Sequence, residues 1–259
     1  MRRRREGVVI NLSGKCALVT GGSRGIGAAT AIMLAESGAD VAIGYRSRRT
    51  DADRVVAEAR KLGVRALAVA ADISTADGAD ALVRQTVDGL GALDVFVGNA
   101  GIWPVEEEDV TAMSDERWRR TMAQNVDSMF FTTRAAARAM RDHGRIVLVA
   151  STAGQRGEAF HADYGASKGA MIAFVKSLAP ELAGRDITVN SVAPGWVDTE
   201  MCAIPYAEGG RERIAATIPL GRVADPRDIA GPIVFLCSPL ARHVTGEILN
   251  VNGGSVLCG

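Results

Sequence analysis

The stretch CALVTGGSRGIG, residues 16–27, joins a short apolar run to a glycine-rich turn. Residues 16–20 have the composition of a buried strand, and the pattern over residues 26–37 is typical of a helix. Glycines between a strand and a helix let the backbone approach a pyrophosphate, and the helix N-terminus favours its negative charge. The glycine spacing differs from the common GxGxxG, so the prediction of a dinucleotide-binding turn depends on this strand–turn–helix context.

Short apolar runs alternate with longer helical patterns along the whole chain, which is the signature of βαβ units. Most of the runs are apolar throughout, as strands buried on both faces should be. The predicted strands are residues 16–20, 41–45, 65–70, 93–97, 145–150, 187–192 and 248–251. The predicted helices are residues 26–37, 52–62, 76–90, 115–140, 163–182 and 226–236. We therefore expect an α/β protein, a single-domain Rossmann fold with a doubly wound, seven-stranded parallel sheet and helices on both faces.

No Pro/Ser-rich linker and no internal repeat divides the 259 residues, so one domain over residues 12–259 is the simplest organisation. Residues 1–11 are interpreted as a flexible tail, in which Arg2–Arg5 is a solvated basic run. Residues 199–219 combine proline, glycine and mixed charge after the sixth predicted strand. We expect them to form a flap of one or two short helices that closes over a substrate.

Composition argues against several classes of partner. Thirty basic residues balance thirty acidic ones, so charge provides no reason to expect nucleic acid or a membrane surface as partners. No apolar run is long enough to span a bilayer. The four cysteines are scattered without a CxxC pair, which argues against a metal site and against a disulfide framework. A cytoplasmic, reduced protein is expected.

The end of the second predicted strand indicates which nucleotide binds. NAD-binding proteins of this type usually place a carboxylate there for the adenosine ribose, but residues 43–48 read IGYRSR. Arg46 stands where a 2′-phosphate needs a cation, and Arg24 in the glycine turn could approach the same phosphate. A solvated basic turn is the alternative. We favour NADP(H) as the cofactor, with NAD(H) left open.

Three side chains, a phenol, an ammonium and a hydroxyl, are spaced along the sequence in a way that suits carbonyl chemistry. Tyr164 and Lys168 are four residues apart, on one face of a predicted helix, and Ser151 precedes the tyrosine by thirteen residues. Because a nearby cation favours phenolate, the spacing predicts a lowered pKa for Tyr164. A serine hydroxyl alongside could hold a carbonyl oxygen. The pair alone is also compatible with a helix surface, but a bound hydride donor makes carbonyl reduction the better interpretation.

With the glycine turn, Asn99-Ala100-Gly101 and Ser…Tyr-x-x-x-Lys in this order, the chain resembles the short-chain dehydrogenase/reductase family from about Leu12 to its C-terminus. Within the family it looks most like 3-oxoacyl-[acyl-carrier-protein] reductases. The catalytic residues implied by the resemblance are Asn125, Ser151, Tyr164 and Lys168. The implied cofactor-binding residues are Gly21, Ser23, Arg24, Gly25, Ile26, Gly27, Tyr45, Arg46, Ser47, Asp72, Ile73, Asn99, Ala100, Gly101, Tyr164, Lys168, Pro194, Gly195, Val197 and Thr199.

The resemblance also implies a role for each catalytic residue. Ser151 would bind the substrate carbonyl, and Tyr164 would donate the proton. Lys168 would lower the pKa of Tyr164 and hold the nicotinamide ribose, while Asn125, at a helix irregularity, would anchor a water that links Lys168 to solvent. Gly98 stands where the family often has a second asparagine, so we expect the support of the sheet to differ locally.

The expected substrate pocket is apolar and aromatic, which suits an acyl chain, a cyclic ketone or a steroid-like ring. Its predicted residues are Ser151, Trp103, Gln155, Phe160, Trp196 and Met201. Core packing is the alternative for at least one tryptophan. His161 is expected at the surface or the pocket edge, because the chemistry needs no histidine.

Three functions fit these observations. The first is NADPH-dependent reduction of a 3-oxoacyl thioester, with an acyl carrier protein as a partner. The second is a dehydrogenase or ketoreductase of a free small molecule, such as a sugar, a cyclic alcohol, a steroid-like compound or a secondary metabolite. The third is a non-catalytic NADP(H)-binding sensor, against which the complete set of four catalytic residues argues. By resemblance, a homotetramer is expected, formed through the two long helices over residues 115–140 and 163–182 and through the C-terminal strand region.

Overall fold

The computed structural model describes residues 10–257. Seven parallel strands form one sheet in the order β3-β2-β1-β4-β5-β6-β7, which confirms the predicted fold class. The strands are β1 (Cys16–Thr20), β2 (Asp40–Tyr45), β3 (Ala66–Ala70), β4 (Val95–Gly98), β5 (Arg145–Val149), β6 (Thr188–Pro194) and β7 (Ile248–Val251). Each overlaps a predicted strand. Residues 1–9 of the predicted tail lie outside the described residues, whereas Ile10 already packs against the core.

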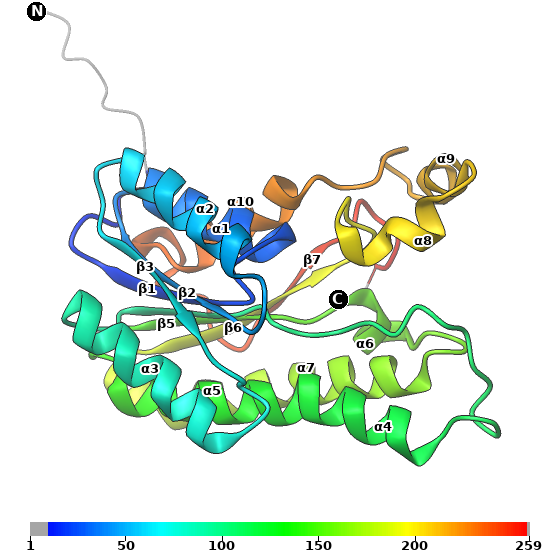
Figure 1. Cartoon of the computed structure of the whole chain (residues 1–259), viewed down its shortest axis with the longest axis horizontal. Coiled ribbons are helices and arrows are strands. Elements are labelled where there is room, and N and C mark those ends of the chain that lie inside the picture. Colours follow the sequence, from blue (N-terminus) through cyan, green and yellow to red (C-terminus); the bar gives the residue numbers. More distant parts are fainter. Residues whose placement is uncertain (1–9, 258–259) are drawn as a thin grey trace, which may run out of the picture.

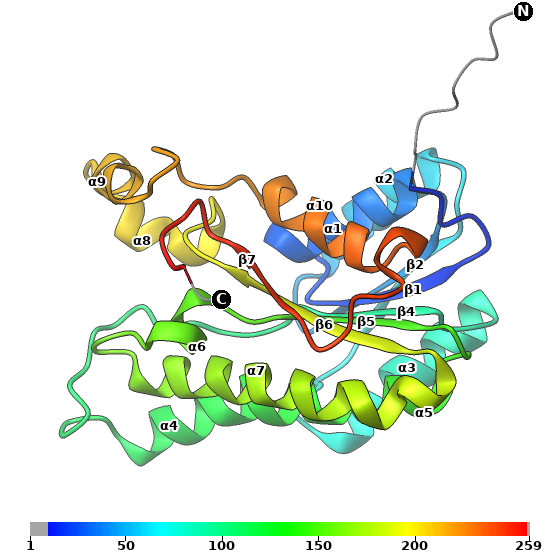
Figure 2. The ribbon, with the colours of Figure 1, turned by 180° about the vertical axis from the view of Figure 1, so that it is seen from behind.

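Helices cover both faces of the sheet (Figure 1). On one face lie α1 (Gly25–Glu36), α2 (Arg49–Lys61) and α10 (Pro226–Leu236), and Figure 2 shows α10 beside α1. On the other lie α3 (Ala76–Leu90), α4 (Asp115–Met122), α5 (Ser128–Ala139) and α7 (Ala162–Leu182). Two apolar clusters result, one for each face. The central strands β1 and β5 are buried along their whole length, and all of their residues except Thr20 and Arg145 are apolar.

The strand order changes direction beside β1, which lies between β2 and β4. At such a switch point the loops leaving two neighbouring strands diverge to opposite faces and open a crevice at the carboxyl ends. The glycine turn leaves β1 there, and the turn containing Asn99 leaves β4. The topology therefore brings together two motifs that are almost eighty residues apart in the sequence.

The helical segments differ from the prediction in two places. The single helix expected over residues 115–140 is α4 followed by a π-helical turn, η1 (Ala123–Asp127), and then by α5. A short helix, α6 (Thr152–Arg156), follows β5 and was not predicted. Five residues are too few to display a helical period, and the helix depends on Ser151, whose side chain caps it.

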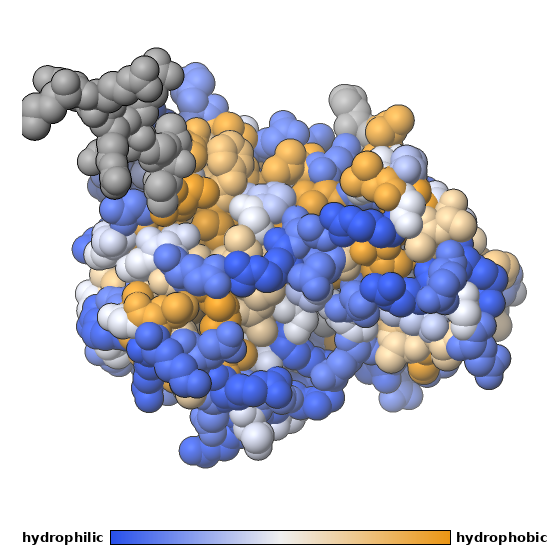
Figure 3. All heavy atoms as spheres, turned by 90° about the horizontal axis from the view of Figure 1, so that it is seen from above, coloured by the Kyte–Doolittle hydropathy of each residue, from blue (hydrophilic) through white to orange (hydrophobic). Residues whose placement is uncertain are grey.

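Residues 199–219 form short helices at one end of the sheet, above α6 in Figure 1. They comprise the 3₁₀ turn η3 (Glu200–Cys202), α8 (Ala203–Tyr206) and α9 (Gly210–Thr217), and we call this segment the flap. Ile204 of the flap and Leu220, which follows it, are both exposed. Elsewhere the face of the molecule in Figure 3 is mostly hydrophilic with small apolar patches. Among residues 10–257, no helix combines the length and apolar character needed to cross a bilayer.

Candidate active site

The glycine turn is a cradle made of backbone. Gly21 has φ +64°, and a Cβ on Gly27 would stand 2.3 Å from the Gly21 carbonyl oxygen. Any side chain at Gly27 would therefore push the turn away from α1. With glycine at both positions, the first turn of α1 faces the crevice with its backbone N–H groups unobstructed. This geometry fits a pyrophosphate.

Asn99 ties the glycine turn to β4. Its Nδ2 donates to the Thr20 carbonyl oxygen at 2.9 Å, and the Thr20 hydroxyl accepts from the N–H groups of Asn99 and Ala100 at 3.0 Å each. Gly98, the last residue of β4, has no room for a side chain. A Cβ there would stand 2.6 Å from Leu148 Cδ2, so a core leucine of β5 fills the space that a larger residue would need.

Three arginines surround the carboxyl end of β2. Arg46 donates to Gln124 Oε1 at 2.8 Å, while Arg24 and Arg48 both pair with Glu200 of the flap, at 2.5 and 3.1 Å. All of these side chains line one cavity. Arg48 and Glu200 were missed by the sequence analysis, because only the folded chain brings the flap beside β2.

Asp72 lies across the same end of the cavity. Hydrogen bonds from the Ser74 hydroxyl, at 2.6 Å, and from its N–H, at 3.1 Å, lower the pKa of the Asp72 carboxyl. The carboxylate is therefore ionised and oriented before any ligand arrives. An ionised acceptor in this place suits an exocyclic amine.

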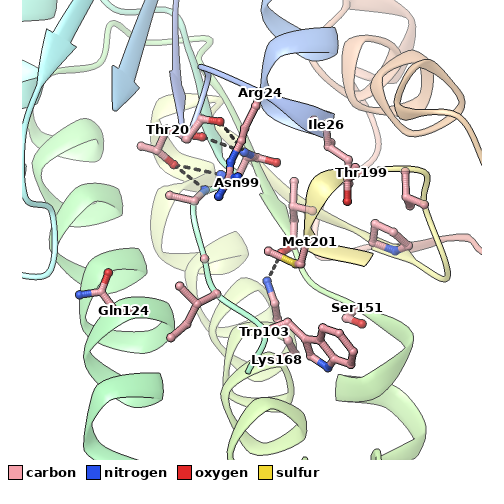
Figure 4. Close-up of a pocket in the computed structure, with 18 of the residues that line it drawn as sticks. Thr20, Arg24, Ile26, Asn99, Trp103, Gln124, Ser151, Lys168, Thr199 and Met201 are labelled. Atoms are coloured by element: carbon pink, nitrogen blue, oxygen red, sulfur yellow. Dashed lines mark hydrogen bonds between the residues drawn. The ribbon is translucent and has the colours of Figure 1, made fainter. Parts of the chain in front are cut away.

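The cavity has a volume of about 570 Å³ and runs from the arginines to Ser151, Tyr164 and Lys168. Every predicted cofactor-binding residue except Gly27 lines it; Gly27 lies behind the turn, against Gly21. Figure 4 shows Lys168, Ser151 and Trp103 at the opposite end of the pocket from Arg24. A backbone cradle between a cationic end and a proton-donating end fits a nicotinamide dinucleotide.

Lys168 lies buried on α7, with Nζ 5.8 Å from the centre of the Tyr164 ring. Its ammonium donates to the Val149 carbonyl oxygen at 2.7 Å. Burial lowers the pKa of Lys168 to about 8. Lys168 can therefore gain or lose its proton close to neutral pH.

The pKa of Tyr164 is raised, not lowered as the spacing alone predicted. Burial of the phenol is the main cause, and a hydrogen bond with Ser151 opposes it. The negative charge of Glu158 raises the pKa further. The prediction from spacing was wrong here because Lys168 is itself desolvated and bonded to the backbone, so it does not offset the burial of the phenol.

Asn125 lies in the π turn and is fully buried. Its Oδ1 accepts from the Ile102 N–H at 2.7 Å, while its Nδ2 donates to the Ile102 carbonyl at 2.9 Å and to Ser167 Oγ at 3.0 Å. The side chain therefore holds the turn after β4 against α7. Its role in anchoring a water stays a prediction.

The predicted substrate pocket holds only in part. Trp103, Trp196 and Met201 line the cavity. Gln155 turns away and donates to Asn250 Oδ1 of β7 at 2.6 Å. Phe160, with φ +63°, is 52% exposed outside the cavity. Neither residue lines the cavity in this structure, although both follow Ser151 in the segment that leads to Tyr164.

His161 is buried, so of its two expected places, the surface and the pocket edge, the first is wrong. Its ring stacks on Trp103 with 4.9 Å between centroids, and its Nδ1 lies 3.8 Å from Glu158 Oε1. Glu158 also accepts from Trp103 Nε1 at 3.2 Å and lines the cavity. Glu158 was missed, although its position between Ser151 and Tyr164 was the available signal.

Comparison with known proteins agrees with this geometry. A family model described as enoyl-(acyl carrier protein) reductase matches residues 21–255. The chain is 41% identical over 249 residues to a 3-oxoacyl-[acyl-carrier-protein] reductase of Synechocystis sp., covering 95% of this chain and 98% of the relative.

Two solved structures are similar over nearly the full chain. One is a short-chain dehydrogenase of Burkholderia cenocepacia in complex with NADP, with a TM-score of 0.89, 36% identity, and coverage of 95% of this chain and 99% of the other. The second is a blue fluorescent protein from a metagenomic library in complex with NADPH, with a TM-score of 0.90, 39% identity, and coverage of 95% and 100%.

Proposed function

Because the chain belongs to the short-chain dehydrogenase/reductase family, whose members are oxidoreductases of carbonyl and alcohol groups, we propose that it reduces the ketone of a 3-oxoacyl thioester with NADPH. The observation that carries the proposal is the joint position of Ser151, Tyr164 and Lys168 at one end of a cavity that runs past the glycine cradle to the arginines at its other end. The name of the Synechocystis relative supports the thioester as substrate.

The choice of NADPH rests on the cationic end of the cavity. Arg24, Arg46 and Arg48 line it, and the end of β2 offers no carboxylate to a ribose hydroxyl. Guanidinium groups bind phosphate through forked, charge-assisted hydrogen bonds, whereas a plain ribose would leave them without that partner. The NADP and NADPH in the two similar structures support the same choice.

The bound nicotinamide would supply the hydride. Ser151 would donate to the substrate carbonyl oxygen and stabilise the charge that grows on it. Tyr164 would give that oxygen its proton; the raised pKa of the phenol keeps the donor protonated at neutral pH. Lys168 would hold the ribose hydroxyls. Although it does not lower the pKa of Tyr164 in the described structure, its positive charge would stabilise the phenolate that forms when the proton is transferred.

The test follows NADPH absorbance with acetoacetyl thioesters, on carrier protein and on N-acetylcysteamine, and with a panel of free ketones. Faster turnover of the thioesters than of the free ketones is expected. Faster turnover of the free ketones would contradict the proposal that the substrate is a thioester. If no compound is turned over but NADPH binds tightly, a non-catalytic nucleotide sensor would be favoured.

A further inference from the structure

The carboxylate of Glu158 lines the reacting end of the cavity. It follows α6 and lines the same cavity as Ser151 and Tyr164. Its side chain is 23% exposed, and its charge is close enough to the Tyr164 phenol to raise the pKa of that group. An acid in such a place constrains what the pocket can hold, since a desolvated carboxylate requires hydrogen-bond donors.

Aromatic rings fix the position of this carboxylate. Trp103 Nε1 donates to Oε1 at 3.2 Å. The Trp103 ring is stacked on His161 and meets Trp196 edge-on, with 6.0 Å between the centroids of the two tryptophans. Because the tryptophan is packed on two sides, the oxygen that it binds cannot swing freely. One half of the carboxylate is thus anchored.

The other half is left for a ligand. Within residues 10–257, no hydrogen bond reaches Glu158 Oε2. Arg156 lines the same cavity and attracts the carboxylate electrostatically, but the two do not form an ion pair in the described structure. Asp163, the next acid along the chain, is occupied by Arg117 and by Thr121. A substrate must therefore satisfy this oxygen or leave it desolvated.

We propose that Glu158 is a specificity-determining residue that selects ketones carrying a hydroxyl group next to the carbonyl. The inference rests on the proposed ketone reduction and names the substrate class for it. A hydroxyl donates a charge-assisted hydrogen bond to Oε2, whereas a methyl group in the same place removes water from the carboxylate without replacing it. Sites built to bind a hydroxyl discriminate strongly against analogues that lack it.

The test compares two N-acetylcysteamine thioesters of equal shape. The acyl groups are 4-hydroxy-3-oxobutanoyl and 3-oxopentanoyl, which differ by a hydroxyl in place of a methyl. We expect the wild-type protein to prefer the hydroxylated thioester by roughly 10- to 100-fold in kcat/KM. Glu158→Leu should abolish or reverse this preference. Glu158→Gln keeps a hydrogen-bond acceptor without the charge, so its ratio of the two kcat/KM values should be intermediate. This second variant keeps the test valid if the leucine variant does not fold.

Glu107→Leu is the matched control, because Glu107 is exposed and does not line the cavity; its ratio should equal that of the wild-type protein. An unchanged ratio in both Glu158 variants, or a wild-type preference for 3-oxopentanoyl, would overturn the proposal. If neither thioester is turned over, the proposed reduction of 3-oxoacyl thioesters fails. The selectivity is then measured as the dissociation constants of both thioesters from the NADPH complex, by nucleotide fluorescence. Equal dissociation constants would overturn the proposed role of Glu158.

Discussion

Glu200 of the flap and Arg24 of the glycine turn form an ion pair, with 2.5 Å between Oε2 and Nη1. Arg48 reaches the same oxygen at 3.1 Å, so one flap carboxylate is shared by two arginines at the end of the cavity. All three side chains are about half exposed. Exposed pairs are weak, at about 0–1 kcal/mol each, so a phosphate dianion can replace the carboxylate.

Glu200→Gln should tighten NADPH binding by roughly three- to tenfold, because it removes an anion that competes with the 2′-phosphate for Arg24 and Arg48. NADH binding should change little. Titration by nucleotide fluorescence measures both dissociation constants, with the exposed flap residue Glu212, changed to Gln, as control. Equal effects on the two nucleotides would refute the competition.

Arg46→Ala should weaken NADPH binding by about 10- to 100-fold, the usual loss for a hydrogen bond to a charged group, and should spare NADH. The side chain now bonds to Gln124, so a phosphate would have to draw it away from a neutral partner only. The same titration tests this. Unaltered NADPH affinity would identify residues 46–48 as a solvated basic turn.

Tyr164→Phe should lower kcat by about 10²- to 10⁴-fold, the range expected for loss of a positioned proton donor. The substitution removes only the hydroxyl group and keeps the ring on α7, so NADPH should bind as before. Steady-state rates and a fluorescence titration on the same preparation separate the two effects. Substantial remaining turnover would remove Tyr164 as the acid.

The stability of the protein should depend on pH through Lys168, whose pKa is lowered by burial from 10.5 to about 8. Between these values the unfolded chain holds a proton that the folded chain has lost, so stability rises with pH in this window. Relative to Lys168→Met, the wild type should gain on the order of 3 kcal/mol in unfolding free energy from pH 7 to pH 10.5. Urea unfolding at several pH values measures the difference. A pH-independent difference would mean that the lysine is not desolvated.

The local motifs could be predicted because their chemistry is contiguous in the chain. The glycine turn is a strand, three glycines and a helix in direct succession, and each part constrains the others. Tyr164 and Lys168 share a helical face by spacing alone.

The homotetramer stays a prediction; the exposed aromatic rings of Trp118 and Phe130, on α4 and α5, are compatible with it. Light scattering should give the mass of four chains.

Other parts of the site depend on contacts that no local pattern encodes. Gln155 lies outside the cavity and donates to Asn250 of β7, and the helix α6 that carries it is too short for periodicity to predict. The raised pKa of Tyr164 reflects how deeply the phenol is buried, which spacing cannot measure.

The amino-acid sequence alone determined the strands, the order of the elements along the chain, the glycine turn between β1 and α1, and the placement of Tyr164 and Lys168 on one helical face, because alternation, glycine placement and helical spacing are local properties. Only the tertiary structure decided that Glu200 meets Arg24 and that Glu158 faces the reacting end of the cavity. Those contacts join segments brought together by the packing of the sheet and its loops. The choice of substrate belongs to this second group, since it depends on which side chains the loops turn inward.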